Sequence, residues 1–140
     1  MDDFERFVEK LQEEIFEDTR RAYGEAGFQR WRHPLYQGRM ANADAQARVK
    51  GTCGDTMEIF LKFEKGCVKA ATYTTDGCGA STVCGSFAAE LALGKNPDEL
   101  ADITGDVILQ KIGRFPEEDE HCAFLAAATL QQALENYMRY

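Results

Sequence analysis

Two neighbouring segments of alternating residues, joined by a very short turn, constrain the fold more than any other feature. In both Met57–Glu64 and Val68–Thr74, apolar residues recur at every second position. A period of two is typical of a β-strand with one buried face. The connecting pair Lys65-Gly66 suits a tight hairpin turn. The sequence therefore predicts an antiparallel hairpin, with the weakly alternating segment Ala45–Lys50 as a third strand.

After Gly79 the hydrophobic period changes to that of a helix, and Gly94 suits the position just past a helix C-terminus. Helical patterns also precede the strands and close the chain. The sequence predicts helices over residues 3–22, from after Gly79 to Gly94, at about 98–102, at 105–112 and over His121–Tyr137, with an irregular connection over Gly24–Asp44.

This order of elements predicts an α+β fold in which several helices pack on a small antiparallel sheet. We expect one domain over residues 1–140, with a core at 29–140 and an N-terminal helical part (1–28) that can move relative to it. The apolar face of that helix, which includes Phe4 and Leu11, could dock on the domain or on a partner.

Charge and hydrophobicity exclude two classes of partner. The net charge is −8 and no dense Lys/Arg cluster occurs, so binding to nucleic acid, which needs positive charge, is not expected. No apolar segment reaches the roughly 20 residues of a membrane-spanning helix. The N-terminal segment is acidic and amphipathic and lacks the pattern of a signal or transit peptide, so we expect a cytoplasmic protein.

Five cysteines in a chain with no sign of secretion favour metal or thiol chemistry over a disulfide framework. Cys53, Cys78 and Cys122 each lie at a junction between predicted elements, and glycines flank the first two. Glycine leaves room beside the sulfur. Cys78 and Cys122 also stand at predicted helix N-termini, where the thiolate is favoured. Thiolates select zinc, copper(I) or iron–sulfur clusters.

A fourth ligand could come from Asp55 or His121. Asp55 is two residues from Cys53, and it could instead stabilise a turn. His121 precedes Cys122, and it could instead cap the last helix. Cys67 and Cys84 lack such settings, and we interpret both as structural.

Taken in order, these motifs resemble the iron–sulfur cluster assembly scaffolds of the IscU/NifU N-terminal family over roughly residues 30–138. The matching features are Cys53-Gly54-Asp55, Gly77-Cys78-Gly79-Ala80-Ser81, Glu90, Gly94-Lys95, Asp98-Glu99, His121-Cys122, Leu125-Ala126 and Ala133-Leu134.

The resemblance implies a three-stranded antiparallel sheet with a metal site at one exposed end. It implies a non-enzymatic scaffold that accepts sulfur from a cysteine desulfurase, builds a [2Fe–2S] cluster with iron and delivers it to apo-proteins. Cys53, Cys78 and Cys122 would be cluster ligands and persulfide acceptors, Asp55 a ligand that keeps the cluster labile, and His121 an accessory ligand. Zinc could occupy the same site in the isolated protein.

One departure concerns a partner. Phe115-Pro116 is followed by Glu117-Glu118-Asp119-Glu120, without the second proline and the lysine that a dedicated Hsp70-type chaperone recognises in the family. Release of the cluster by such a chaperone is therefore not expected.

Other functions remain open at this stage. The protein could be a zinc-binding sulfur acceptor that relays persulfide, although the insertion of the SufU-like branch is absent between Cys53 and Cys78. It could also be an interaction module with a structural metal. A cysteine-nucleophile enzyme with His121 as base is the poorest of these alternatives. Either a monomer or a homodimer could be the working unit.

Overall fold

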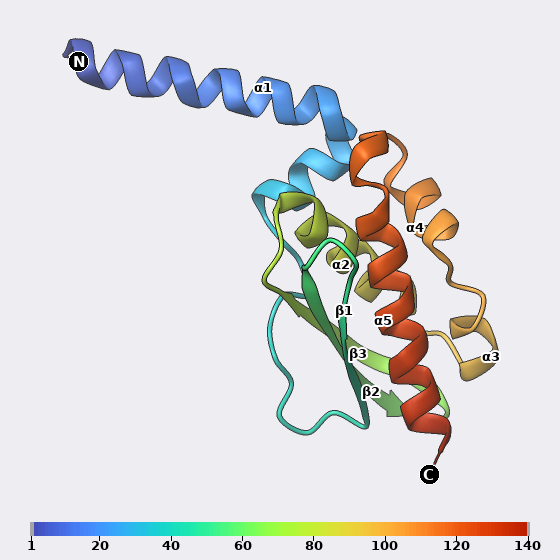
Figure 1. The fold of residues 1–140 in the computed structure, drawn as a ribbon. Coiled ribbons are helices and arrows are strands. Elements are labelled where there is room, and N and C mark those ends of the chain that lie inside the picture. Colours follow the sequence, from blue (N-terminus) through green and yellow to red (C-terminus); the bar gives the residue numbers. More distant parts are fainter. Residues whose placement is uncertain (1, 140) are drawn as a thin grey trace.

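The computed structural model describes residues 2–139, which form an α+β fold with a three-stranded sheet (Figure 1). Its elements are α1 (Asp3–Arg32), β1 (Ala45–Lys50), β2 (Thr56–Glu64), β3 (Cys67–Thr75), α2 (Gly79–Ala92), α3 (Pro97–Leu100), α4 (Gly105–Ile112), a short 3-10 helix (Glu117–Asp119) and α5 (His121–Met138). The fold class predicted from the sequence is confirmed.

The sheet is antiparallel with strand order β1-β2-β3. Ile59 of β2 lies opposite Ala47 of β1 and Tyr73 of β3, so the three strands bury matching positions on the same face. The Lys65-Gly66 turn joins β2 to β3, with Gly66 at a φ of 81°. The predicted hairpin and third strand are confirmed, and β2 and β3 begin one residue earlier than predicted.

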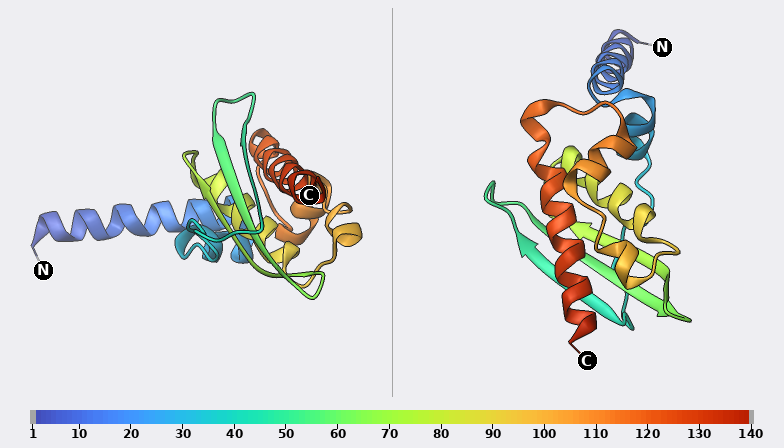
Figure 2. Two further views of the ribbon diagram at one scale, coloured as in Figure 1. Left: turned by 90° about the horizontal axis from the view of Figure 1, so that it is seen from below. Right: turned by 90° about the vertical axis from the view of Figure 1, so that its right-hand side faces the viewer.

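Two helices cover one face of this sheet, α5 over β1 and β2 and α2 over β3 (Figures 1 and 2). Most of α2 is buried, and small residues allow its close approach to the sheet. A methyl group at Gly85 would lie 2.5 Å from the ring of Tyr73. The other long helix, α5, buries Cys122, Leu125 and Thr129 on its inner face. The N-termini of α2 and α5 are thereby fixed at the same end of the domain.

The connection from residue 33 to residue 44 is irregular, as predicted, and it runs along the free edge of β3. The Tyr73 amide donates to the Tyr36 carbonyl (3.0 Å), and the Gly38 amide donates to the Tyr73 carbonyl (2.8 Å). This segment therefore covers backbone groups that an edge strand would otherwise leave unpaired.

The prediction of an irregular chain from Gly24 onward is wrong for residues 25–32. At Gly24 the backbone takes φ 74° and ψ 177°, which kinks α1, and the helix then resumes as far as Arg32. The second part of α1 packs on the domain through Phe28, which is fully buried. The first part projects away from the body (Figure 2). Whether that part moves stays a prediction.

Within residues 2–139, every helix is too short or too polar to cross a bilayer.

Candidate metal centre

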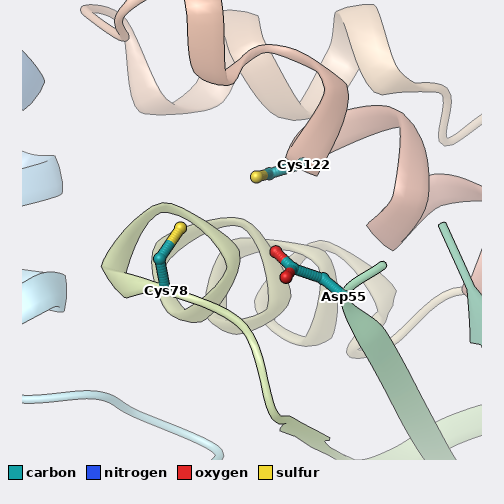
Figure 3. A group of neighbouring side chains, drawn as sticks. All are labelled: Asp55, Cys78 and Cys122. Carbon is teal, nitrogen blue, oxygen red and sulfur yellow. The ribbon is translucent and has the colours of Figure 1, made fainter. Parts of the chain in front are cut away.

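Three side chains from separate parts of the chain converge at one end of the domain. Asp55 directly precedes β2, Cys78 occupies the N-cap position of α2, and Cys122 lies in the first turn of α5. One carboxylate oxygen and the two sulfur atoms all lie within 4.8 Å of one another, and Figure 3 shows the three side chains pointing to a common space. Zinc binds sulfur at about 2.3 Å and carboxylate oxygen at about 2.1 Å. Small side-chain rotations would therefore place all three groups on one ion.

The loop before β2 aims Asp55 at this space. The Gly51 amide donates to the Asp55 carbonyl (2.7 Å), and the Gly54 amide donates to the Gly51 carbonyl (3.0 Å). Gly54 has a φ of 95°, which favours glycine. The Asp55 carboxylate accepts a hydrogen bond from Ser81 of α2 (2.9 Å). Within residues 2–139, the Asp55 carboxylate therefore hydrogen-bonds to Ser81 of the centre and to no backbone group of its own turn.

Two glycines make room around Cys78. A Cβ atom at Gly77 would lie 2.6 Å from both Asp55 Oδ2 and Ser81 Oγ, and one at Gly79 would lie 2.5 Å from Trp31 Nε1. The exposed Cys78 side chain makes no capping hydrogen bond to α2, so its sulfur is free to bind a ligand. A residue larger than glycine at position 77 would displace Asp55 or Ser81, and one at position 79 would displace the Trp31 ring.

Cys122 has a different environment, because it is fully buried. Burial raises the pKa of its thiol to about 11, the hydrogen bond from Ser81 opposes this rise, and the negative charges of Cys78 and Asp119 add to it. The sequence-based expectation that the helix N-terminus favours the thiolate is therefore wrong for Cys122 without a metal. A bound cation would replace the proton, because coordination deprotonates a thiol.

Ser81 is the residue of the centre that the sequence did not single out. Its hydroxyl lies 2.9 Å from Asp55 Oδ2 and 3.4 Å from Cys122 Sγ, and the side chain is buried. Its position could have indicated this role, because Ser81 follows Cys78 by three residues and therefore lies on the same face of α2.

Cys53 and His121 lie outside this three-residue group. Cys53 is exposed in the loop that holds Asp55. His121 is also exposed, and its Nε2 atom lies 3.6 Å from Cys122 Sγ. The structure thus brings together three of the five predicted site residues and leaves these two at the edge.

The remaining cysteines have surroundings that fit a structural role. Cys84 is fully buried within α2, and burial raises its pKa well above the ordinary value. Cys67 is half-buried at the start of β3, whereas the end of that strand leads to the centre.

Comparison with known proteins decides the family. The model of the NifU-like N terminal domain matches residues 22–140. The chain belongs to this family. The resemblance predicted from the cysteine motifs is thereby confirmed. Residues 3–21 of α1 precede the matched region.

Relatives of this NifU-like domain include two iron–sulfur cluster assembly scaffold proteins, IscU 1 and IscU 2, of Archaeoglobus fulgidus. Each is 32% identical over 118 residues, which cover 84% of this chain and 77% of the relative. Among solved structures, a NifU-like protein (N-terminal) from Brucella abortus has a TM-score of 0.66 at 19% identity, covering 86% of this chain and 96% of that one.

A second solved structure comes from Fervidobacterium islandicum AW-1, a protein provisionally assigned as an iron–sulfur cluster assembly scaffold for the SUF system. Its TM-score is 0.63 at 18% identity, and the match covers 83% of this chain and 98% of that one. Both structural matches confirm the fold of the NifU-like domain.

Proposed function

We propose that this NifU-like domain is a scaffold that assembles a [2Fe–2S] cluster on Asp55, Cys78, Cys122 and Cys53 and passes it to apo-proteins. The observation that carries the proposal is the convergence of one carboxylate oxygen and two sulfurs within 4.8 Å at one end of the domain. Its membership of a family that includes iron–sulfur scaffolds supports the same function.

The cluster is cargo, and two properties of the centre suit temporary binding. Asp55 supplies a hard oxygen ligand beside soft thiolates, and iron held by oxygen exchanges more readily than iron held by four sulfurs. Cys53 lies on an exposed loop beside a glycine with a φ of 95°, so that its sulfur can approach the other ligands or leave them. His121, next to Cys122, would serve as an accessory ligand during exchange.

Sulfur would arrive as a persulfide on the active cysteine of a cysteine desulfurase. The Cys53 thiolate attacks the terminal sulfur, the sulfur–sulfur bond of the donor breaks, and the desulfurase keeps its own thiolate. The transferred sulfur must gain two electrons to become a bridging sulfide, so assembly requires an external electron donor and ferrous iron. Cys53 would be the first acceptor, because it is exposed and lies outside the group that Asp55, Cys78 and Cys122 form.

Anaerobic reconstitution with ferrous iron, sulfide and a desulfurase tests this assignment. We expect thiolate-to-iron absorption bands that fall at least about tenfold in Cys53→Ala, Cys78→Ala and Cys122→Ala, because each change removes a ligand. Asp55→Ala should keep the bands but slow the transfer of the cluster to an apo-protein.

Cys67→Ala is the matched control, since it removes a sulfur at the far end of β3 and should leave the bands unchanged. Bands that survive all three ligand substitutions would exclude this site. Equal or faster transfer by Asp55→Ala would exclude its role in lability.

A second candidate function is a zinc-bound sulfur acceptor that relays persulfide without building a cluster. The separation of the exposed Cys53 from the group of Asp55, Cys78 and Cys122 favours it, because three ligands could hold zinc while Cys53 takes the sulfur. The same reconstitution distinguishes the two functions: bound zinc that iron and sulfide do not displace, with a persulfide on Cys53, would support the relay.

In either function the protein accepts and delivers sulfur species and does not itself catalyse a reaction. We place it in the cytoplasm, with a desulfurase and apo-proteins as partners. Exposed acidic residues at 117 and 118 occupy the segment before the His121-Cys122 pair, so we infer release without a dedicated Hsp70-type chaperone.

A further inference from the structure

The first part of α1 carries an apolar stripe that faces solvent. It consists of Phe4, Phe7, Val8, Leu11 and Ile15, which are 73%, 63%, 45%, 45% and 46% exposed. These residues recur at intervals of three and four, so they lie on one face of the helix. Phe16, the residue after the stripe, contacts Phe28 and Trp31 of the second part of α1. The exposed stripe therefore covers the part of the helix that lies before these contacts.

A helix in this position is expected to have a partner. Most helical stability in proteins comes from packing of the apolar face rather than from the intrinsic propensity of the residues. Contiguous exposed apolar residues generally mark an interaction surface. The stripe also lies before the residues that match the family model, and it contains none of the proposed cluster ligands.

Charges along one edge of the stripe indicate which partner fits. With about 3.6 residues per turn, Asp3, Lys10, Glu14 and Arg21 follow one another along that edge, beside Phe7. Their signs alternate, and their positions are symmetric about residue 12. When a second copy of the helix runs in the opposite direction, Asp3 meets Arg21 and Lys10 meets Glu14, with opposite charges in each pair.

We propose that the first part of α1 pairs with the same segment of a second copy in an antiparallel arrangement. In this register Leu11 lies near the two-fold axis, and Phe7 of one copy packs against Ile15 of the other. The exposed bonds of Arg21 to Glu17 (3.1 Å) and Asp18 (3.5 Å) are weak enough to be exchanged for Asp3 of the partner copy.

The shape of the molecule favours the antiparallel direction. The stripe belongs to a helical arm that projects from one end of the body (Figure 2). Each residue adds about 1.5 Å, so the arm before the kink is about 30 Å long. An antiparallel pair places the two bodies at opposite ends of this rod, whereas a parallel pair would bring both bodies to the same end.

Other occupants fit these charges less well. An anionic membrane would repel the acidic residues around the stripe. A basic groove of another protein would place Lys10 and Arg21 against like charges. In both cases the isolated chain would stay monomeric, and the test below would report that result.

Sedimentation equilibrium of the full chain tests the proposal. We expect a dimer that Leu11→Asp converts to a monomer. Glu14→Lys should weaken the dimer about tenfold, because two attractive pairs become two repulsive ones. The double variant Lys10→Glu/Glu14→Lys should restore most of the affinity, since it reverses both charges of each pair.

Glu13→Lys is the matched control, because it makes the same change of charge on the opposite face of α1 and should leave the dimer intact. A wild-type chain that is monomeric at every concentration measured would overturn the proposal. A dimer that Leu11→Asp leaves unchanged, or a double variant no tighter than Glu14→Lys, would overturn it equally. None of these substitutions changes a proposed cluster ligand, and each result is read by a different measurement, so a failed pairing and a failed reconstitution can be told apart.

Discussion

At the scale of single residues, Ser81 explains how the centre stays assembled before a metal binds. Its hydroxyl contacts both Asp55 and Cys122, which belong to elements far apart in the sequence. It thereby holds a carboxylate and a thiol together without an ion. A bound metal would take over these contacts, so that Ser81 acts on the site through its ligands.

The difference in burial between the cysteines predicts an order of reaction with iodoacetamide in the metal-free protein. We expect the exposed Cys53 and Cys78 to react first, and the buried Cys122 at least about tenfold more slowly at neutral pH, because the thiolate is the reactive form. With its pKa raised to about 11, Cys122 should react faster with each step in pH up to that value. Mass spectrometry of digested samples would give each rate.

Cys84 provides the control for this measurement, since it is fully buried and should react only after unfolding. Cys122 reacting as fast as Cys53 at neutral pH would contradict the buried position of its sulfur. Added zinc should protect Cys78 and Cys122 more than Cys53.

Part of this centre could be predicted from residues alone. Cys78 and Cys122 were predicted as candidate ligands, because their motifs place them at the ends of elements, whereas Asp55 stayed open between a ligand and a turn residue until the family resemblance favoured the ligand. The separation of Cys53 could not be predicted, because the direction of its side chain depends on the loop that Gly51 and Gly54 shape. Burial of Cys122 depends on how α5 packs, which the helix N-terminus does not reveal.

At the scale of elements, the strands were predictable and the kink in α1 was not. Alternation of residues identified all three strands, because a half-buried sheet requires that pattern. Gly24 was interpreted as the end of a helix, since glycine commonly breaks one. The structure instead uses it to redirect the helix, and the contacts of Phe28 and Arg30 then determine the new direction. The Arg30–Glu90 ion pair, at 2.7 Å, joins this second part of α1 to α2.

Gly24→Ala is therefore expected to destabilise the protein by about 1–3 kcal/mol. With φ 74° and ψ 177°, Gly24 occupies a region that is nearly restricted to glycine. An added Cβ would also lie 3.3 Å from Cβ of Arg114. Urea denaturation monitored by Trp31 fluorescence would measure the loss.

A substitution two residues earlier serves as its comparison. Ala22 is exposed in the regular part of α1, so Ala22→Ser should change the free energy of unfolding by less than about 0.5 kcal/mol. Equal stability of Gly24→Ala and the wild type would mean that the chain does not need this backbone conformation.

At the scale of the whole molecule, a compact body and a projecting arm share one chain. The main cluster of buried apolar side chains lies between residues 45 and 134, and the buried Phe28 and the partly buried Trp31 attach the second part of α1 to that body. The arm contributes little to burial within one chain. Its apolar stripe gains its contacts, under the proposed pairing, from a second copy. The free energy of unfolding should accordingly have two parts. Packing of the body contributes a part that does not depend on protein concentration, and pairing of the arms contributes a part that does.

Removal of the first 14 residues separates these two components. At protein concentrations too low for pairing, the shortened and full chains should unfold with free energies within about 1 kcal/mol, because the side chains of residues 2–14 are exposed. At higher concentrations the full chain alone should gain stability, since association that requires the folded helix favours the folded state by mass action. Urea denaturation at several concentrations would measure both effects. A shortened chain that is markedly less stable at low concentration would show that the arm stabilises the body of its own chain. A full chain whose stability is the same at every concentration would argue against the pairing, while leaving the proposed metal centre unaffected.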